Sequence, residues 1–568
     1  MYNVPQAIFL AEKVGGLLER SEVLLGAMPQ SKNKRNMKEL DIPAMEELQT
    51  LAKARDVRLI LGDQLNFGHD WFTSNPDPEI TFVLMEVRSE TDYARHHIQK
   101  VVSFFAAMRL FAMELHQKGH RVLYLTLDDP RNLHSIPENL EWICSEAAAT
   151  QSAWQQPDEY RMDEILAKWS AICDRRDWDW SISDSQHFFT QREDLATFFK
   201  GKKTYRLETF YRSMRKKHNI LMTSAMEPEG GEWNFDASNR QKLPKNHTLP
   251  PPKLFQRNVS TLVALLESSG VETIGRIRAD AFPWPLTRVE GLEMLQHFAQ
   301  ELLPFFGDFQ DAMTTECWTV YHSRLSFLMN VKLISPYEVV QTVEQAWRDD
   351  PERVHISQAE GFIRQILGWR EYMRGVYWAE MPTYETLNFF DHQQPLPSWF
   401  WTGKTKMKCL SHSIDQSLEH AYAHHIQRLM VTGNFALLAG VHPDAVDAWY
   451  LGVYIDALQW VEITNTRGMS QFADGGIVGS KPYVSSAQYI KKMGPYCGSC
   501  HYRAQDKTGA SSCPFNSLYW DFHVRHRSKL ERNPRIGMAY RTWDKMDPAK
   551  QQALLETAAH HLENIESL

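Results

Sequence analysis

Short apolar runs alternate with a long helical pattern in the first third of the chain. Residues 57–62, 81–87 and 121–127 are rich in β-branched and aliphatic side chains, whereas residues 93–118 have helical periodicity. Apolar strands joined by amphipathic helices are typical of a parallel, doubly wound sheet. We therefore predict an α/β domain over residues 56–190. No GxGxxG motif follows its first strand, so a dinucleotide on this sheet is not supported.

The pattern changes further along the chain. Residues 191–255 contain a basic cluster, a glycine-rich turn and three consecutive prolines, which are typical of a linker. Helical periodicity rich in aromatic residues then dominates, and it predicts a large all-α domain over residues 256–540 with a helical tail over 541–568. Residues 1–55 hold two helix-like stretches around a polar break and form an N-terminal extension of unknown role.

The composition is that of an ordinary globular protein, with 43% hydrophobic and 23% charged residues among 568. Uninterrupted apolar stretches stay shorter than the roughly 18 residues that a membrane span needs. The first ten residues have no basic flank followed by an apolar stretch, which argues against a secretory signal. We expect a cytoplasmic monomer that does not bind membranes. Seven cysteines in such a chain favour free thiols or metal ligands over disulfides.

Charge is unevenly distributed. The chain has a formal net charge of −8, yet residues 481–545 contain twelve Lys or Arg against four Asp or Glu. A second basic cluster lies within residues 200–217. Such stretches attract phosphate backbones, although a solvated surface has the same composition. Charge alone leaves both interpretations open.

Cysteine spacing is the most specific local signal. Cys497 and Cys500 form a C-x2-C pair, Cys513 precedes a proline, and Cys409 lies upstream. Four thiolates suit a tetrahedral zinc site or a [4Fe–4S] cluster. Spacing alone does not decide between the two.

Histidines and aromatic residues form a second group. Residues 419–428 are predicted to be helical, and neighbouring helical residues diverge by about 100°, so only one of His424 and His425 is expected to point straight into a given cavity. A histidine near neutral pKa is a suitable proton donor. His420 and His424 have a spacing that would also suit a metal. Tryptophans such as Trp401 and Trp449 are explained by core packing, unless they form a redox relay.

Seven separated motifs together resemble one family. They are VRLILGDQL (57–65), WNFD (233–236), FPWP (282–285), HSRLS (322–326), GWREY (368–372), WY (449–450) and GMSQFADGG (468–476). In this order, and with the four cysteines, the chain resembles the photolyase and cryptochrome superfamily, and within it the iron–sulfur bacterial branch of prokaryotic (6-4) photolyases. The resemblance covers about residues 57–540.

The resemblance implies an α/β antenna domain and an all-α domain that holds a U-shaped FAD. It places Glu462 near flavin N5, where many relatives carry asparagine. It also implies a ribityllumazine antenna chromophore bound near Asp63 and Glu86. The residues that match FAD-binding positions are His322, Ser323, Arg324, Leu325, Ser326, Gln365, Arg370, Asp456 and Glu462.

Further roles follow from the same resemblance. Cys409, Cys497, Cys500 and Cys513 match the ligands of a [4Fe–4S] cluster. Trp401, Trp449 and Tyr450 match an electron path from the surface to the flavin. His424, His425 and Tyr483 match the residues at the lesion.

The function implied is light-driven repair of UV-damaged DNA. Excited reduced FAD passes an electron to a (6-4) pyrimidine–pyrimidone adduct that has been flipped out of the duplex, and a histidine supplies a proton. The resemblance also fits a cryptochrome-like blue-light photoreceptor. Without the resemblance, the cysteines indicate a zinc module in a nucleic-acid-binding protein.

Overall fold

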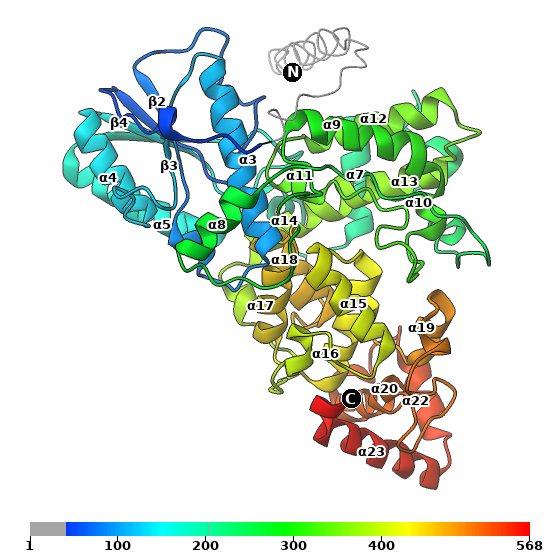
Figure 1. Cartoon of the computed structure of the whole chain (residues 1–568). Helices are drawn as coiled ribbons and strands as arrows, with labels where there is room; N and C mark the ends of the chain where they lie inside the picture. Colours follow the sequence, from blue (N-terminus) through cyan, green and yellow to red (C-terminus); the bar gives the residue numbers. More distant parts are fainter. Residues whose placement is uncertain (1–40, 203) are drawn as a thin grey trace. The chain divides into compact units, whose positions relative to one another are not determined.

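A five-stranded parallel sheet organises the first part of the structure. The computed structural model describes residues 41–202 and 204–568, so residues 1–40 of the extension predicted over residues 1–55 lie outside the described residues. The strand order is β3-β2-β1-β4-β5, and every neighbouring pair is parallel. This order confirms the doubly wound α/β prediction (Figure 1). The strands are β1 (Asp56–Leu59), β2 (Ile80–Met85), β3 (Arg121–Leu125), β4 (Gln151–Gln155) and β5 (Asp179–Ser183).

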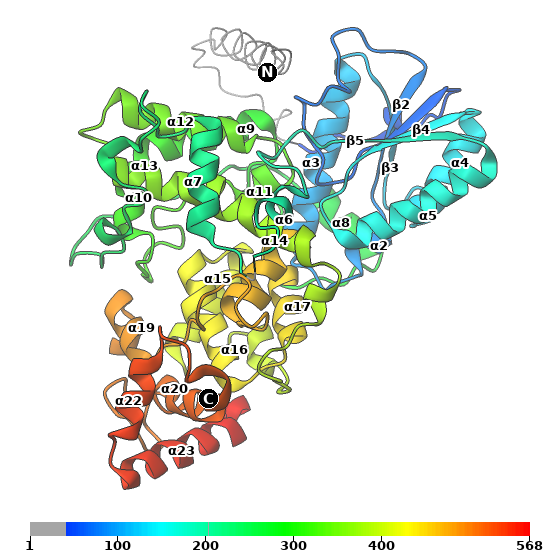
Figure 2. The same ribbon diagram turned by 180° about the vertical axis from the view of Figure 1, so that it is seen from behind.

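Alternate positions of the strands bury their side chains against opposite layers of helices, as the two-residue period of a strand requires. Phe82 and Leu84 of β2 pack in the core that contains α3 (Ile98–Gln117). Val83 and Met85 pack in a second core with α4 (Ile136–Ala147) and α5 (Tyr160–Arg176). Figure 2 shows α4 and α5 along one side of the sheet and α3 on the other. The sheet is therefore buried on both faces, as expected for parallel strands.

The helix predicted over residues 93–118 begins later than the periodicity indicates. Residues 88–91 form the separate short helix α2 (Arg88–Thr91), and α3 starts only at Ile98. His97 has an extended backbone, and its side chain accepts a hydrogen bond from the Gln99 amide at 3.1 Å. The prediction was wrong for residues 93–97 because this histidine caps the helix.

The remainder of the described chain is helical. After β5, residues 184–202 and 204–568 form no strand beyond isolated bridges, which confirms the all-α prediction for the second half. The helices are α6 (Asp194–Phe198), α7 (Leu207–His218), α8 (Ser260–Ser268), α9 (Arg288–His297), α10 (Leu303–Phe309), α11 (Ser326–Asn330), α12 (Pro336–Asp349), α13 (Ile356–Ile363), α14 (Glu371–Glu380), α15 (Lys408–His420), α16 (Asn434–Ala439), α17 (Pro443–Val453), α18 (Gln459–Ile463), α19 (Ala487–Met493), α20 (Pro514–Arg525), α21 (Arg527–Leu530), α22 (Gly537–Asp544) and α23 (Pro548–Glu563).

Wide π-helical turns interrupt several of these helices. The segment η6 (Arg364–Arg370) joins α13 to α14, η9 (Gln427–Gly433) precedes α16, and η10 (Thr464–Ser470) continues α18. A π-turn shifts the register of the helix and is frequently found at functional sites. In these three segments, side chains therefore point in directions that differ from those of a continuous α-helix.

The α/β domain and the helical domain lie backbone against backbone at Gly452. The His97 amide donates to the Gly452 carbonyl at 2.9 Å. A Cβ atom added to Gly452 would lie only 2.4 Å from the carbonyl oxygen of Arg95. This glycine is therefore required because a side chain there would collide with the main chain of the other domain.

We expect Gly452→Ala to lower the free energy of unfolding by about 1–3 kcal/mol, because overpacking against backbone has little room to relax. Urea unfolding followed by circular dichroism measures the change. Gly537→Ala is the matched control, since its nearest neighbour is a flexible Arg541 side chain at 3.8 Å. Equal stabilities of the two variants would contradict the close contact.

Candidate functional site

A large cavity lined by both apolar and polar side chains lies inside the helical domain. We call it the central cavity; it encloses about 1380 Å³, and the π-helical segments η6, η9 and η10 all contribute to its wall. It collects most of the residues predicted to bind a cofactor or a lesion. Those that line it are His322, Ser323, Arg324, Ser326, Gln365, Arg370, His424, His425, Tyr450, Asp456 and Glu462. Leu325, fully buried, and Tyr483 do not line it.

An ion pair fixes one wall of the central cavity. Arg428 donates to Asp456 at 2.9 Å, and the Ser326 hydroxyl donates to the same carboxylate at 2.7 Å. Burial alone would raise the pKa of Asp456, but these two partners outweigh burial and hold the pKa below its usual value. Asp456 is therefore anionic at neutral pH. Sequence reasoning missed Arg428, which ends the histidine-rich motif.

Several buried polar atoms of the residues that line the central cavity make no hydrogen bond. Within residues 41–202 and 204–568, Nη1 of Arg324, Nε and Nη1 of Arg370 and Oε1 of Glu462 make no hydrogen bond. Unpaired buried donors are costly, and guanidinium groups match phosphate oxygens. The donor set of this cavity therefore fits a large ligand that carries phosphates and hydrogen-bonding ring atoms, as FAD does.

The two predicted histidines lie on a broken helix. α15 ends at His420, and Ala421 adopts the left-handed conformation (φ 51°). The continuous helix predicted over residues 419–428 is therefore wrong. Because the chain is not helical at residues 421–424, both His424 and His425 line the central cavity instead of only one. His420 stacks on Trp318 at 4.4 Å and does not share a metal site with His424.

His424 is uncharged at neutral pH. Its ring is buried and stacks on His322 with centroids 4.8 Å apart. Burial, together with the neighbouring His322, His425 and Arg428, lowers the pKa of His424 well below its usual value. The ring therefore offers a neutral N–H donor and an acceptor nitrogen to the cavity.

Glu462 is also neutral at pH 7, because burial raises the pKa of a carboxyl group whereas it lowers that of a histidine. Burial and the nearby carboxyl of Asp447 raise the pKa of Glu462 well above its usual value. Asp447 itself accepts from Arg467 at 2.8 Å. A protonated carboxyl group at this position can donate a hydrogen bond, as the amide of an asparagine can.

Aromatic rings lead away from the central cavity. Tyr450 lines the cavity, its ring lies 5.2 Å from that of Trp449, and Trp449 contacts Phe400 at 5.3 Å. Phe400 in turn stacks on Trp399 at 4.7 Å. Trp401 is 36% exposed, and no ring contact joins it to Trp449 in the described structure. A ring contact therefore joins Tyr450 to Trp449, whereas none in the described structure joins Trp401 to either of them.

The four predicted cysteine ligands line one small cavity. Cys409, Cys497, Cys500 and Cys513 surround this cysteine cavity, which encloses about 310 Å³. Burial, followed by the other three thiols, raises the pKa of Cys409 well above its usual value. Across the described residues, no three His, Cys, Asp or Glu side chains converge on a single-ion position. The four thiols therefore line one common space.

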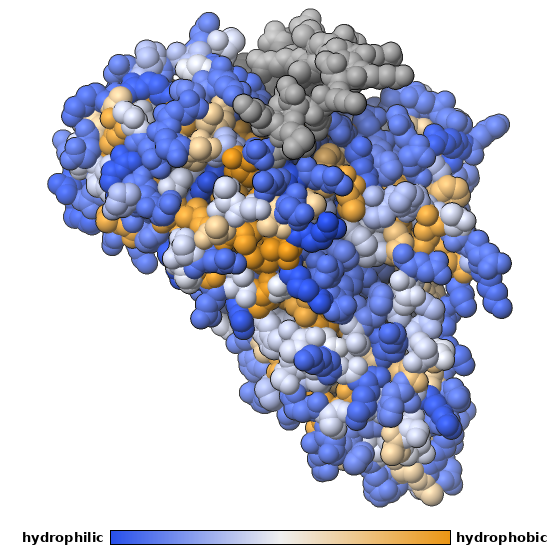
Figure 3. All heavy atoms as spheres, in the orientation of Figure 1, coloured by the Kyte–Doolittle hydropathy of each residue, from blue (hydrophilic) through white to orange (hydrophobic). Residues whose placement is uncertain are grey.

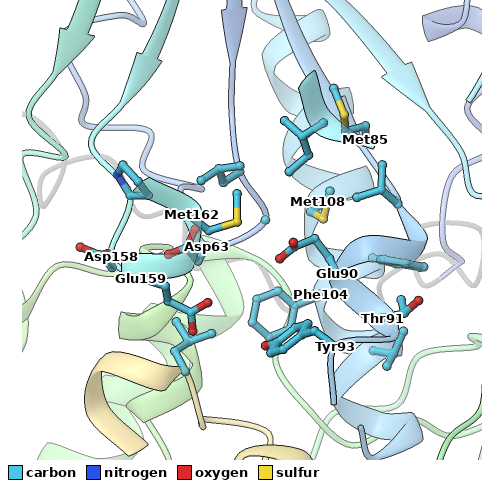
Figure 4. A pocket seen from close by; sticks show the side chains of 18 of the residues that line it. Asp63, Met85, Glu90, Thr91, Tyr93, Phe104, Met108, Asp158, Glu159 and Met162 are labelled. Atoms are coloured by element: carbon cyan, nitrogen blue, oxygen red, sulfur yellow. The ribbon is translucent and has the colours of Figure 1, made fainter. Parts of the chain in front are cut away.

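A further cavity lies at the carboxyl ends of β1 and β4. This sheet-end cavity encloses about 880 Å³ and combines an apolar wall with the acids Asp63, Glu90, Asp158 and Glu159 (Figure 4). Glu86 does not line it, because a bidentate ion pair with Arg109 (2.7 and 2.9 Å) holds this carboxylate in the protein interior. Sequence reasoning missed Glu90 and Glu159. Their position beside strand ends is the signal that could have found them.

Comparison with known proteins gives the family. A family model described as "Deoxyribodipyrimidine photo-lyase-related protein" matches residues 58–282. A (6-4) photolyase of Agrobacterium fabrum is 39% identical over 518 residues, which cover 89% of this chain and 99% of that protein. The chain belongs to the photolyase and cryptochrome family.

Solved structures share the photolyase fold. A crystal structure of a bacterial class III photolyase from Agrobacterium tumefaciens matches with a TM-score of 0.52 at 14% identity, covering 91% of this chain and 100% of that one. A cryptochrome from Synechocystis sp. matches with a TM-score of 0.51 at 13% identity, covering 89% of this chain and 94% of that one. The arrangement of an α/β domain and a helical domain is thus that of photolyases and cryptochromes.

The surface of this photolyase family member is largely polar on the face shown in Figure 3. Among the described residues, no helix is both long enough and apolar enough to cross a bilayer. In the basic stretch 481–545, Arg525, Arg527 and Lys529 bond to acidic neighbours. The exposed cations of this stretch without a salt bridge in the described structure are Lys491, Lys492, Lys507, Arg532, Arg535, Arg541 and Lys545.

We expect His424 to make the protein acid-sensitive. The unfolded chain binds a proton at this ring below about pH 6.5, whereas the folded chain does not, so stability falls as the pH drops through this value. His424→Gln should reduce the slope of unfolding free energy between pH 6 and 5 by up to about 1.4 kcal/mol per pH unit. Urea titrations at several pH values measure the slope. His560→Gln, at an exposed position on α23, is the control; an unchanged slope in His424→Gln would refute the buried neutral state.

Proposed function

We propose that this protein is a light-driven DNA repair enzyme that reverses (6-4) pyrimidine–pyrimidone photoproducts. The observation that carries the proposal is the convergence of paired histidines with a phosphate-fitting set of arginines in one cavity. A (6-4) photolyase that is 39% identical over nearly the whole chain supports it. The residues of the cavity and the sequence identity to a (6-4) photolyase therefore support the same activity.

The central cavity binds FAD in this proposal. Arg324 and Arg370 supply unpaired guanidinium donors for phosphate and ring oxygens, and Ser326, Arg428 and Asp456 form a fixed polar wall. When bound, FAD supplies the light-driven transfer of a single electron. Glu462 faces the cavity as a protonated carboxyl group, so it donates a hydrogen bond without bringing a negative charge to the cofactor.

In this proposal, His424 and His425 carry out proton transfer at the lesion. Both rings line the central cavity, and the stack on His322 fixes the orientation of His424. Since His424 is neutral, its N–H acts as a hydrogen-bond donor to the adduct and its other nitrogen can accept a proton. The lesion reaches these rings only when it is flipped out of the duplex, and damage lowers the cost of unstacking. We assign Tyr483 to the surroundings of the lesion, outside the wall of the cavity.

The electron path of the proposal runs through Tyr450 and Trp449 toward Trp399 and Trp401. Ring contacts between 4.7 and 5.3 Å support the section from Tyr450 to Trp399. Trp401 lies two residues beyond Trp399 and is exposed, so it would accept electrons from reductants in solution. The exposed cations of residues 481–545 contact the DNA backbone.

We assign a [4Fe–4S] cluster to the cysteine cavity. A zinc ion needs all four sulfurs within about 2.3 Å of one point, whereas a cluster fills a space between thiolates. Four thiols around a common volume supply the four thiolate ligands that such a cluster takes. Bound there, the cluster would tie α15 to the loops around residues 497–513.

The sheet-end cavity suits a ribityllumazine antenna. Its apolar wall includes Phe104 and Met108, which suit an aromatic ring system, while Asp63 and Glu159 offer acceptors for a hydroxylated chain. Carboxylates in excess of cations disfavour a phosphorylated ligand. We propose this ligand for the cavity, with Glu86 supporting the sheet through Arg109 instead of contacting the chromophore.

Repair of synthetic DNA carrying one lesion tests the function. Light should restore intact pyrimidines from a (6-4) substrate and not from a cyclobutane substrate, as measured by chromatography of the digested DNA. His424→Ala and His425→Ala should retain FAD by absorption, yet lose at least about 100-fold in repair rate, the usual contribution of a positioned proton-transfer group. His420→Ala, outside the cavity, should repair normally. Flavin photochemistry without repair in the wild type would indicate a light sensor instead.

Loss of one cysteine tests the cluster. Cys409→Ser should lower the iron content of the purified protein severalfold and reduce its soluble yield, because metal binding is coupled to folding. Iron is measured by colorimetric assay and the broad cluster absorption. Cys144→Ala, buried in the α/β core outside the cysteine cavity, should retain full iron. Normal iron in Cys409→Ser would exclude this residue as a ligand.

A further inference from the structure

The central cavity and the sheet-end cavity are joined by one short segment. The helix α11 contributes Ser326, Met329 and Asn330 to the wall of the central cavity. Lys332 lies two residues after the end of α11. Its ammonium group bonds to Asp63 and Asp158, two of the acidic residues that line the sheet-end cavity. A displacement of α11 is therefore transmitted to both cavities.

Lys332 is bonded to the α/β domain at several atoms. Its ammonium group donates to Asp158 at 2.6 Å and to the Asp63 carbonyl at 2.6 Å, and it lies 3.4 Å from the Asp63 carboxylate. The ammonium and the Asp158 side chain are almost fully buried. A main-chain bond from the Leu65 amide to the Val331 carbonyl, 3.0 Å long, holds the same two loops together. The loops therefore move as a unit.

The opposite end of this segment depends on the central cavity. Ser326 and Asn330 both bond to Asp456, at 2.7 and 2.8 Å, and Arg370 donates to the Met329 carbonyl at 3.4 Å. Asp456 and Arg370 themselves line the central cavity, and Arg370 has unpaired donors there. A ligand that engages Arg370 and the polar wall thus also fixes α11.

We propose that Lys332 and α11 couple the two cavities, so that a ligand bound in the central cavity increases the affinity of the sheet-end cavity. The physical route is continuous: the central ligand orders α11, α11 fixes Lys332, and Lys332 holds Asp63 and Asp158 in the positions that contact the second ligand. Lys332 is a positioning residue in this scheme, since it does not itself line either cavity. The inference rests on the proposed binding of FAD and a ribityllumazine.

Coupling between sites is reciprocal and commonly amounts to a factor of about 5–150 in affinity. We therefore expect FAD-loaded protein to bind a ribityllumazine at least about fivefold more tightly than FAD-free protein. Fluorescence titration gives both dissociation constants. If the FAD-free chain proves unstable, the dissociation constant of FAD measured with and without the lumazine gives the same coupling by reciprocity.

The variant must remove the ammonium without leaving a buried charge. Lys332→Met alone would leave Asp158 without its main cation, which is strongly destabilising. The double variant K332M/D158N removes both charges of this pair, and the buried Arg374, 3.7 Å from Asp158, keeps its bond to the Thr190 carbonyl. K332R keeps the positive charge for rescue. R257M/E290Q is the matched control, because it removes a buried ion pair of 2.6 Å whose residues line neither cavity.

The proposal requires the coupling factor to fall to about one in K332M/D158N, to stay near the wild-type value in R257M/E290Q, and to recover in part in K332R. An unchanged factor in K332M/D158N, or equal lumazine affinities of FAD-loaded and FAD-free wild type, would overturn it.

Should the wild type bind no lumazine at all, the antenna assignment fails, and hydrogen exchange decides the coupling. FAD must then slow exchange of residues 61–65 in the wild type but not in K332M/D158N; equal exchange with and without FAD refutes the coupling.

Discussion

The arrangement of the two domains depends on the first turn of α3. Three side chains there, His97, Gln99 and Lys100, donate to or contact main-chain carbonyl groups of the helical domain at 2.7–2.9 Å. Main-chain carbonyls cannot move without moving their helices, so these bonds fix the backbone of the domain and not only its surface. The carbonyls lie at Arg276, Leu418, Glu419, Leu451 and Ala457.

This junction also separates the two large cavities. Lys100 lines the sheet-end cavity, while the carbonyl of Ala457, to which it donates at 2.7 Å, belongs to a residue that lines the central cavity. Residues 456–458 therefore contribute to both cavities, and the buried ammonium of Lys100 holds this segment. Burial lowers the pKa of Lys100 to about 8, and the charge is tolerated because it is bonded to carbonyl groups.

Protonation inside the central cavity is decided by burial. His424 and Glu462 ionise in opposite senses, yet burial makes both of them neutral at pH 7. The charged side chains of its wall include Arg324, Arg370, Arg428 and Asp456, and of these Arg428 and Asp456 neutralise each other. The cavity thus combines neutral hydrogen-bonding groups and a fixed ion pair with two arginines, whose positive charges suit a ligand that carries phosphates.

The sequence determined the doubly wound sheet, the all-α second half, the four cysteines of one cavity and most residues of the central cavity. The sheet and the helical half follow from periodicity, which is a local property of the chain, whereas the residues of the central cavity follow from the resemblance of separated motifs to a known family. Only the tertiary structure decided that Glu86 pairs with Arg109 away from the sheet-end cavity and that Glu90 and Glu159 line it. It also decided that both His424 and His425 face one cavity, because Ala421 breaks the helix. These outcomes depend on contacts between residues that lie far apart in the sequence. A local sequence pattern carries no information about the energies of such contacts.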